Sequence, residues 1–481
     1  MEKFLKKVFL LLLASTLVIT NVLPINAYAK HKDDDDATEI TVSNEEVIKI
    51  AKEAYIYGLS LVEMERSKNK MTHPQYKGDT EWAKLGEFYH VRNFADPSTT
   101  RLRAPNIDVL YSGAWVNLED QPVIVYVPDM GDRYYAIQVS DMYSNVEGYI
   151  GTRTTGTKEG FYAIVGPEWE GDLGVKVDGI INVDTNYTWL FPRIFTKDQA
   201  DLEVVHTLQD KLNILPLDKY KKHGRKALKK TYPQKDDGMQ LEEEPYGKIE
   251  YFEVLNEILD EIGMPESEAE LMARFDSIGI GPNSEFEVDS LSPELKEIFT
   301  NVAIESEQLI TYVLNMPSQT INGWGGSKKV GLFGDDYFLR ALCARGGIGG
   351  NTAEEAYYPN SYFDVDNGRY NGSNDYTLTF PAGKIPPVNA FWSLTLYDSS
   401  NHCLTDNVIN KYAIRDVDSE LKYNEDGSLT MYIQSEAPVG FEGNWLPSPK
   451  GKEFHIIFRA YMPGQEWFTG EYTLPGVKRV K

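Results

Sequence analysis

The densest group of polar side chains in this 481-residue sequence lies just before its first long apolar strand pattern. The group consists of Arg101, Arg103, Asn106, Asp108 and Tyr111. Side chains of these types can converge on an anion or on the hydroxyl groups of a small molecule, because arginine presents paired N–H donors. The same residues can instead tie down an entry loop, with the asparagine and the aspartate satisfying backbone amides. We favour the structural role, and the binding role stays open.

Signatures of the common catalytic mechanisms are absent from the sequence. The chain has no Gly-x-Ser-x-Gly nucleophile elbow, no Gly-x-x-x-x-Gly-Lys phosphate loop and no His-Glu-x-x-His motif. The glycine-rich segment 346–350 lacks the lysine of a phosphate loop, and we expect it to be a flexible hinge between domains. The histidines show no spacing typical of metal ligands.

A calcium loop is also not indicated. In the segment 364–368 the glycine stands at the fifth position, whereas an EF-hand loop needs it at the sixth. An Asx-rich turn explains the segment without a metal. We therefore expect neither a metal nor a cofactor.

The elements that would position the polar group alternate along the chain between helical and strand patterns. Ser43 and Glu46 form a capping box before apolar residues at helical spacing. From about residue 106, short apolar strands are separated by glycine-rich turns, as in a β-sandwich. Within this region, 123–127 and 134–139 are predicted to form a hairpin. These patterns define an N-terminal domain over 44–215.

The rest of the chain is predicted to be helical and then β again. Thr196 and Gln199 form a second capping box. Residues 216–350 are mainly helical in pattern, apart from a charged segment at 218–245 that we expect to be an exposed linker or loop. In the C-terminal domain, 351–481, Trp392, Leu394 and Leu396 alternate with Phe391, Ser393, Thr395 and Tyr397, which predicts a strand.

The charge of the chain excludes some classes of partner. Aspartate and glutamate outnumber lysine and arginine by 73 to 48, which gives a net charge of −25. General binding to nucleic acid depends on neutralising phosphates with basic residues, and docking on an anionic membrane needs a basic surface. We expect neither nucleic acid nor an anionic membrane surface as a partner, and the oligomeric state stays open.

The N-terminus predicts export. Three lysines precede an apolar core at 8–22, and Ala27-Tyr28-Ala29 supplies a small-x-small cleavage pattern, so residues 1–29 are predicted to be a signal peptide. An acidic leader, 30–43, follows. We expect a secreted, periplasmic or cell-envelope protein that is not embedded in the membrane after cleavage. The sequence contains two cysteines, Cys343 and Cys403, which we expect not to form an essential disulfide.

Two parts of the sequence resemble known domain families. PNIDVLYS at 105–112 and YIGTRTTG at 149–156 are similar to the bacterial domain of unknown function 1254. FWSLTLYD at 391–398 resembles its usual companion, the domain of unknown function 1214. The resemblance implies an α+β multidomain protein with an N-terminal immunoglobulin-like β-sandwich, a helical middle and a C-terminal jelly-roll-like β-sandwich. It implies no established reaction, cofactor or catalytic residue.

The polar and aromatic residues of these two blocks suggest a site for a polar small molecule, such as a sugar or an ester, between the β-domains. The candidate ligand-binding residues are Arg103, Asn106, Asp108, Tyr111, Arg153, Trp392 and Asp398. If the site hydrolyses its ligand, Asp108 or Asp398 would be the base and an arginine would stabilise charge. The alternative is a non-catalytic cell-envelope interaction module in which most of these residues are buried.

Overall fold

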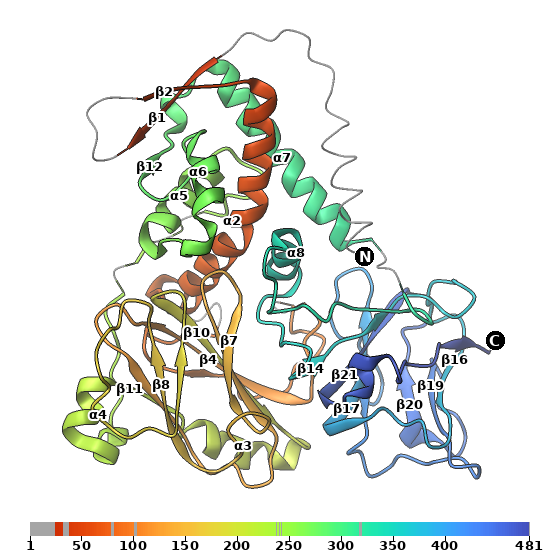
Figure 1. Ribbon diagram of the computed structural model, residues 1–481. Helices are drawn as coiled ribbons and strands as arrows, with labels where there is room; N and C mark the ends of the chain where they lie inside the picture. Colours follow the sequence, from red (N-terminus) through yellow and green to blue (C-terminus); the bar gives the residue numbers. More distant parts are fainter. Residues whose placement is uncertain are drawn as a thin grey trace.

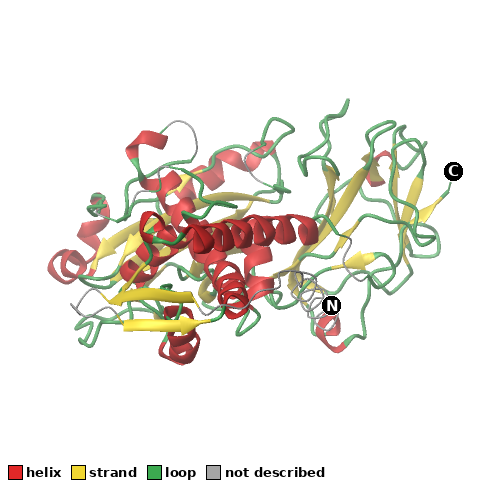
Figure 2. Cartoon of the chain, turned by 90° about the horizontal axis from the view of Figure 1, so that it is seen from above, coloured by secondary structure: helices red, strands yellow, loops and turns green. Residues whose placement is uncertain are grey.

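The computed structural model describes residues 25–31, 38–77, 81–100, 103–236, 238–239, 241, 243–316 and 320–480, and for 25–31 and 38–41 it describes the backbone alone. The chain is a multidomain α+β protein with antiparallel and mixed sheets. Two β-regions lie beside each other, and a group of helices lies above the first of them (Figure 1). Seen from above, the helices occupy the middle of the molecule and the C-terminal strands lie to one side (Figure 2).

Groups of strands and groups of helices alternate along the chain. The helices are α2 (Asn44–Thr72), α3 (Leu202–Gln209), α4 (Leu217–His223), α5 (Tyr251–Ile262), α6 (Ala269–Asp276), α7 (Pro293–Leu314), α8 (Tyr337–Gly347) and α9 (Glu466–Thr469). Short 3₁₀ helices are η1 (Pro74–Tyr76), η2 (Gln199–Asp201), η3 (Gly224–Lys229), η4 (Glu266–Glu268), η5 (Val288–Ser290) and η6 (Glu442–Asn444).

The strands of the first half are β1 (Ile25–His31), β2 (Thr38–Val42), β3 (Tyr89–His90), β4 (Val109–Asn117), β5 (Val123–Val127), β6 (Tyr135–Ser140), β7 (Val146–Gly151), β8 (Gly160–Val165), β9 (Gly179–Asn182), β10 (Tyr187–Phe195) and β11 (Asn213–Pro216). Those of the second half are β12 (Ser284–Glu285), β13 (Trp324–Gly325), β14 (Ala356–Tyr357), β15 (Asn360–Ser361), β16 (Tyr376–Phe380), β17 (Val388–Asp398), β18 (Ala413–Arg415), β19 (Leu429–Gln434), β20 (Trp445–Pro447), β21 (Phe454–Pro463) and β22 (Lys478–Arg479).

The N-terminal β-region consists of two sheets with a shared core. One sheet has the order β3-β4-β10-β6-β7 and the other β11-β5-β8-β9. Apolar side chains from both sheets, such as Val116 and Ile137 from the first and Val125 and Ile164 from the second, are buried in one cluster. The predicted two-layer packing of alternating strands is thus present in this part of the chain.

The hairpin predicted between 123–127 and 134–139 is wrong. Strand β5 pairs with β8 and β11, whereas β6 pairs with β10 and β7, so the two strands belong to different sheets. The connection between them crosses the sandwich, and Met130 within it is buried in the core shared by both sheets. A tight turn and a crossing connection use the same Asp and Gly residues, so the local sequence could not separate them.

Helix α2 begins at the predicted cap. The Ser43 side chain accepts a hydrogen bond from the backbone N–H of Glu46. The buried face of α2 packs against α5, α7 and α8, and its side chains share a core with residues such as Leu255 and Phe299. Helix α7 starts in a similar way, because Ser292 accepts from the N–H of Leu295 and Pro293 occupies the first helical position.

The second predicted capping box is wrong. Thr196 donates its hydroxyl to the carbonyl of Ile194, and Asp198 is the residue whose side chain caps η2, at the backbone N–H groups of Ala200 and Asp201. The chain stays extended through Phe195, so the helix starts later than the Thr-x-x-Gln pattern suggested. In the charged segment 218–245, part of the chain is also more ordered than a linker, since α4 and η3 cover the outer face of the second sheet.

The C-terminal β-region is built on a second pair of sheets. Their orders are β13-β15-β21-β17-β18, with β14 also on β21, and β20-β19-β16-β22. Trp392, Leu394 and Leu396 of β17 point into the core between these sheets, as their alternation predicted. The other face of β17 and β21 is buried as well, because it packs against the N-terminal β-region, where Phe391 and Tyr461 contact Tyr134.

The glycine-rich segment 346–350, whose first two residues end α8, is held by packing, which argues against a free hinge. Gly349 has a φ of +77°, and a Cβ atom there would lie 2.7 Å from Cζ3 of Trp189. Its carbonyl accepts a hydrogen bond from Arg193. Gly347, two residues earlier, has no atom within 4 Å of a Cβ position.

This difference gives a matched pair of substitutions. We expect Gly349→Ala to destabilise the protein by about 1–3 kcal/mol, since it combines a left-handed backbone with a clash against a buried ring. Gly347→Ala should leave the melting temperature within about 1 °C or raise it slightly. Thermal unfolding of the two variants checks this, and equal melting temperatures would support a mobile hinge instead.

Three further features bear on the sequence predictions. No helix in the described ranges is both long and apolar enough to cross a membrane. Cys343 and Cys403 are unpaired thiols. The predicted apolar core at 8–22 and the four aspartates at 33–36 lie outside the described residues, whereas 25–31 and 38–42 form the paired strands β1 and β2.

Candidate functional site

Asp108 lies where the two β-regions meet, directly before β4. Its side chain is fully buried. Oδ2 accepts hydrogen bonds from the hydroxyls of Ser393 on β17, at 2.7 Å, and Tyr461 on β21, at 3.0 Å. Oδ1 is buried and has no hydrogen-bond partner among the described residues. The aspartate therefore faces the C-terminal β-region, and it does so inside a closely packed contact between the two β-regions, where Ser393 and Tyr461 bond to it.

Arg459 on β21 is the buried cation beside Asp108. It donates to the hydroxyl of Tyr397 at 2.7 Å, to the carbonyl of Ala104 at 2.9 Å and to Oγ1 of Thr395 at 3.0 Å. Burial lowers the pKa of Arg459, but the neighbouring Tyr397, Tyr461 and Asp108 outweigh this and raise the pKa well above its ordinary value. A permanently charged arginine thus ties the loop before β4 to the C-terminal sheet.

Asn106 and Tyr111 hold the same loop from the other side. Oδ1 of Asn106 accepts from the backbone N–H groups of Asp108, at 2.9 Å, and Val109, at 3.2 Å. Its Nδ2 donates to the hydroxyl of Tyr111. The ring of Tyr111 stacks on Phe191 with 5.2 Å between centroids. These contacts are those of the structural role that we favoured for the group.

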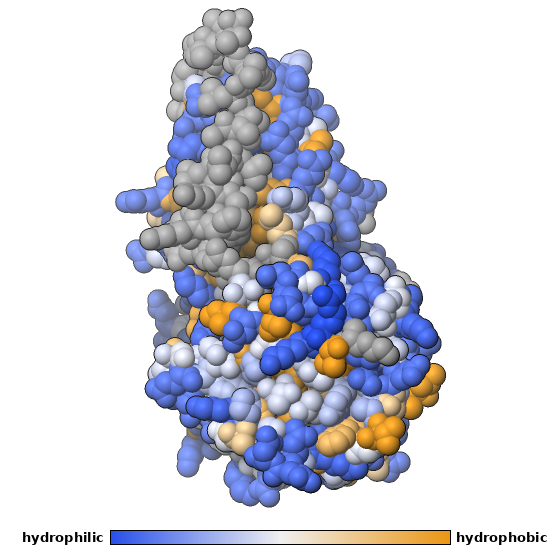
Figure 3. Space-filling model, turned by 90° about the vertical axis from the view of Figure 1, so that its right-hand side faces the viewer, coloured by the Kyte–Doolittle hydropathy of each residue, from blue (hydrophilic) through white to orange (hydrophobic). Residues whose placement is uncertain are grey.

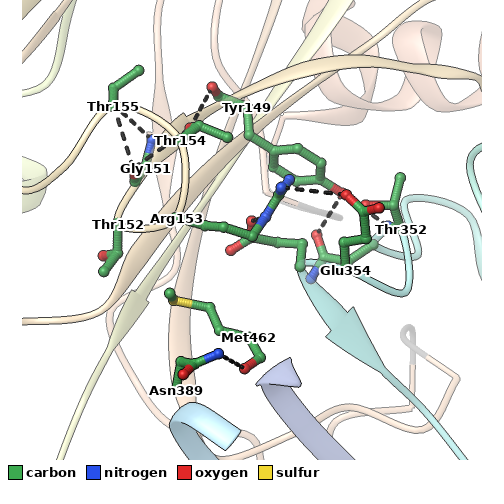
Figure 4. A network of polar contacts seen from close by, with 12 residues as sticks. Tyr149, Gly151, Thr152, Arg153, Thr154, Thr155, Thr352, Glu354, Asn389 and Met462 are labelled. Atoms are coloured by element: carbon green, nitrogen blue, oxygen red, sulfur yellow. Dashed lines mark hydrogen bonds and ion pairs between the residues drawn. The ribbon is translucent and has the colours of Figure 1, made fainter. Parts of the chain in front are cut away.

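Arg153 lies in the turn after β7 and contacts a different stretch of the same interface. Its Nε donates to Glu355 at 2.7 Å, and its guanidinium lies 5.3 Å from the centre of the Tyr149 ring, close to Glu354 (Figure 4). Glu355 also accepts from the hydroxyl of Tyr134 at 2.8 Å. The carboxylate partner of Arg153 is thus supplied by the C-terminal half of the chain.

Trp392 and Asp398 are separate from this group. Trp392 is 1% exposed and stacks on Phe458 inside the C-terminal sandwich, with 5.5 Å between ring centroids. Asp398 uses one oxygen to accept from the backbone N–H of Ser400 at 2.8 Å and from the hydroxyl of the same residue at 2.5 Å. Trp392 is thus a core residue and Asp398 a turn residue.

Sequence reasoning missed Arg459 and also a second buried arginine in this interface. Arg193 on β10 donates to Gln138 at 2.8 Å and to Asn351 at 2.9 Å, and also to the carbonyl of Gly349. Asn351 in turn donates to the hydroxyl of Tyr358 at 2.7 Å. The available signal was an arginine inside an otherwise apolar strand, which applies to Arg193 in YTWLFPRIF and to Arg459 in FHIIFRAYMP.

A cavity of ≈ 610 Å³ opens beside this interface, within the range typical of small-molecule sites. We call it the interdomain cavity. Its lining comes from the loop at Arg103, from the end of α7, from α8, and from the C-terminal β-region, where Ser399, His402 and His455 face it. Tyr358, a partner of the buried interface, lies in its wall. Of the predicted site residues, Arg103 is the one in this lining.

Four of the lining residues form a directed chain of hydrogen bonds. Nη2 of Arg103 lies 2.8 Å from Nε2 of His402, Nδ1 of His402 lies 3.5 Å from Nε2 of His455, and Nδ1 of His455 lies 3.5 Å from the hydroxyl of Ser399. Arginine can only donate, so each histidine must accept on Nε2 and donate from Nδ1. Ser399 therefore receives a hydrogen bond at its oxygen, and its own O–H is left to donate elsewhere.

Both histidines are neutral near pH 7. Burial, followed by the charge of Arg103, lowers the pKa of His402 from 6.5 to about 4. Burial, followed by His402, lowers the pKa of His455 to about 3. No group of three or more His, Cys, Asp or Glu side chains that could hold a metal occurs in the described part of the chain.

These shifts predict a pH dependence of stability. Between pH 6.5 and the lower folded-state values, the unfolded chain binds more protons at these histidines than the folded chain, so their contribution to stability falls as the pH falls. We expect the melting temperature of the His455→Gln variant to fall less between pH 7 and pH 4.5 than that of the parent protein. Glu147, whose pKa burial raises to about 8, acts in the opposite direction but equally in both proteins. Parallel curves of melting temperature against pH would contradict the expectation.

A second cavity, of ≈ 730 Å³, lies between the loop 93–98 and the C-terminal β-region. Three of its charged side chains are engaged in local structure. Asp96 accepts from Ser98, Asp198 caps η2, and Arg415 pairs with Asp418 at 2.9 Å. The interdomain cavity is the better candidate, because it combines Arg103, which has no carboxylate partner among the described residues, with the hydrogen-bond chain through His402 and His455.

Comparison with known proteins agrees with the resemblance seen in the sequence. Residues 85–216 match the family model described as "Protein of unknown function (DUF1254)", and residues 355–465 match "Protein of unknown function (DUF1214)". No curated protein matches the chain.

Two solved structures are similar to this one. The VPA0106 protein from Vibrio parahaemolyticus aligns with a TM-score of 0.66 and 27% identity, over 90% of this chain and 100% of that chain. A putative uncharacterized protein from Burkholderia cenocepacia aligns with a TM-score of 0.44 and 13% identity, over 90% and 94% of the two chains. Both family predictions are confirmed, and the chain belongs to the proteins that carry a DUF1254 domain followed by a DUF1214 domain.

Proposed function

We propose that this protein binds a polar small molecule, such as a sugar or an ester, in the interdomain cavity. The observation that carries the proposal is the guanidinium of Arg103 in the cavity lining. It contacts a neutral histidine and has no carboxylate partner among the described residues. A cation without a counter-ion, next to a serine hydroxyl that is free to donate, offers hydrogen-bond donors to a ligand oxygen.

The hydrogen-bond chain favours binding over hydrolysis. To activate Ser399 as a nucleophile, His455 would have to accept its proton on Nδ1. That would turn both histidines around and leave an N–H of His402 facing the N–H groups of Arg103. A pKa of about 3 also makes His455 a poor base near neutral pH.

The experiment is a thermal-shift screen of the purified protein against sugars, esters, organic acids and divalent ions. A compound that binds only the folded protein must raise its melting temperature. The matched variants are Arg103→Gln, in the cavity, and Arg225→Gln, an exposed arginine that pairs with Glu159. We expect a hit whose shift is lost in the first variant and kept in the second. No hit, or equal shifts in both variants, would refute the proposal.

A cell-envelope interaction module without a ligand is the second candidate. It is favoured by the burial of Asn106, Asp108 and Trp392, which were predicted to contact a ligand. An interaction surface usually shows a continuous apolar patch. On the face in Figure 3, the described residues are mostly hydrophilic and the apolar ones form small separate groups. This face thus gives the second candidate no support.

We also propose that the protein is exported and cleaved after Ala29, and that the two sandwiches are immunoglobulin-like and jelly-roll-like. The charged start, the apolar core and Ala27-Tyr28-Ala29 support export. The paired sheets around each β-core support the sandwich assignments. Mass spectrometry of the exported protein tests the cleavage, and retention of Met1 would contradict it.

A further inference from the structure

We infer that the ligand of the interdomain cavity is an amphipathic anion, with one anionic head group and an apolar chain. The inference rests on the proposed function, since it assumes that the cavity binds a small molecule. It goes further by assigning the charge of the ligand and a division into polar and apolar parts. The division follows from which side chains each element brings to the cavity.

The helical side of the cavity is apolar. The end of α7 and the helix α8 contribute Val313, Leu314, Leu339 and Leu342, and Met316 and Val330 continue this surface. Cys343 belongs to the same side, and burial raises the pKa of its thiol to about 12, so it is uncharged. An apolar group of a ligand that covers these side chains removes their surface from water, which contributes favourably to the free energy of binding.

The β side of the cavity is polar and cationic. It holds Arg103, Arg369, Ser399 and the neutral pair His402 and His455. Arg369 pairs with Glu453 at 3.5 Å, where both side chains are about half exposed, and Arg103 has no carboxylate partner among the described residues. The lining described for the cavity contains no aspartate or glutamate. A cationic side without carboxylates suits an anion and disfavours an ammonium group.

The protein as a whole repels anions, so the local charge decides selectivity. The net charge of −25 gives a negative field around most of the surface. An anion held here must be fixed by direct hydrogen bonds from Arg103 and the Ser399 hydroxyl. Both groups donate, because the direction of the chain through His402 and His455 leaves the serine O–H free. Carboxylate and sulfate oxygens share the acceptor chemistry that these donors require.

The test measures dissociation constants for a set of ligands that differ in one property at a time, below their micelle concentrations. The set is decanoate, decyl sulfate, decanol, decyltrimethylammonium, hexanoate and acetate. We expect decanoate or decyl sulfate to bind at least tenfold tighter than decanol, and the ammonium compound not to bind. Each buried methylene is worth about fourfold in affinity, so decanoate should bind on the order of 10²-fold tighter than hexanoate.

Two variants separate the two sides of the cavity. Arg103→Gln should lower the affinity for the anions about 10- to 100-fold and leave the affinity for decanol unchanged, because it removes charged hydrogen bonds to the head group alone. Leu342→Ser should lower the affinities for decanoate and decanol by similar factors. The melting temperature of each free variant shows whether it is folded, and the wild-type series stands as a test without either variant.

The outcomes distinguish this inference from the proposed function. Equal affinity for decanoate and decanol, or binding of decyltrimethylammonium, overturns the anionic head group and leaves a cavity that binds small molecules. A shift with sugars or esters but with none of the decyl compounds overturns the inference and keeps the proposed function. No binding by any compound in either set overturns both. A preference for decanoate over decyl sulfate, or the reverse, identifies the head group.

Discussion

Asp108→Asn is expected to lower the free energy of unfolding by about 3–5 kcal/mol. The aspartate is fully buried and accepts hydrogen bonds from Ser393 and Tyr461. Asparagine keeps the shape and can still accept these bonds, but it removes the negative charge beside Arg459. Because the arginine cannot lose its proton, a buried cation would stay without its counter-charge. Denaturant unfolding of the variant measures the loss.

The controls distinguish a structural from a ligand-binding aspartate. Asp398→Asn alters a turn at the surface and should cost less than about 1 kcal/mol. In a double-mutant cycle with Arg459→Gln, we expect Asp108→Asn to cost clearly less than it does alone, since the two charges interact. An Asp108→Asn variant with unchanged stability and a lost ligand response would show that Asp108 is part of the binding site.

Trp392→Ala should cost about 3–5 kcal/mol, as removal of a large buried aromatic side chain usually does. The indole is 1% exposed and packs between Phe380 and Phe458 in the C-terminal sandwich. The backbone N–H of Trp392 donates to Asp416 and is unaffected by the substitution. Thermal or denaturant unfolding measures the effect.

Trp392→Phe is the matched control for this substitution. Phenylalanine keeps most of the aromatic contact, so we expect it to recover more than half of the loss. Ligand affinity, measured at a temperature where both variants are folded, should equal that of the parent. A variant that keeps its melting temperature but no longer binds the cavity ligand would place Trp392 at the site after all.

The sequence allowed the layout to be predicted well where a pattern depends on neighbouring residues. The cap at Ser43 and the inward positions of Trp392, Leu394 and Leu396 follow from local hydrogen bonds and from the period of a strand. The supposed hairpin at 123–139 failed, because sheet membership depends on partners far along the chain, such as β8 and β10.

The candidate site was harder to predict for the same reason. Arg103 and His402 are 299 residues apart in the sequence, and His402 and His455 are 53 residues apart, yet the three side chains contact one another. No local pattern marks such a meeting. Asp108 and Arg153 were found from the sequence, but their partners Arg459 and Glu355 come from the other half of the chain. A burial pattern shows which side chains are inside and cannot show which of them touch.

The buried interface also bears on how this protein folds and unfolds. Arg193 and Glu355 each bond to side chains or carbonyls from the opposite half of the chain, and Asp108 and Arg459 do the same. Separating the two β-regions would remove hydrogen-bond partners from all four charged groups at once. The halves should therefore lose their structure in one cooperative transition, with neither forming a stable intermediate alone. For this chain both domains are then required for folding, because the charged groups buried in each half find their partners in the other.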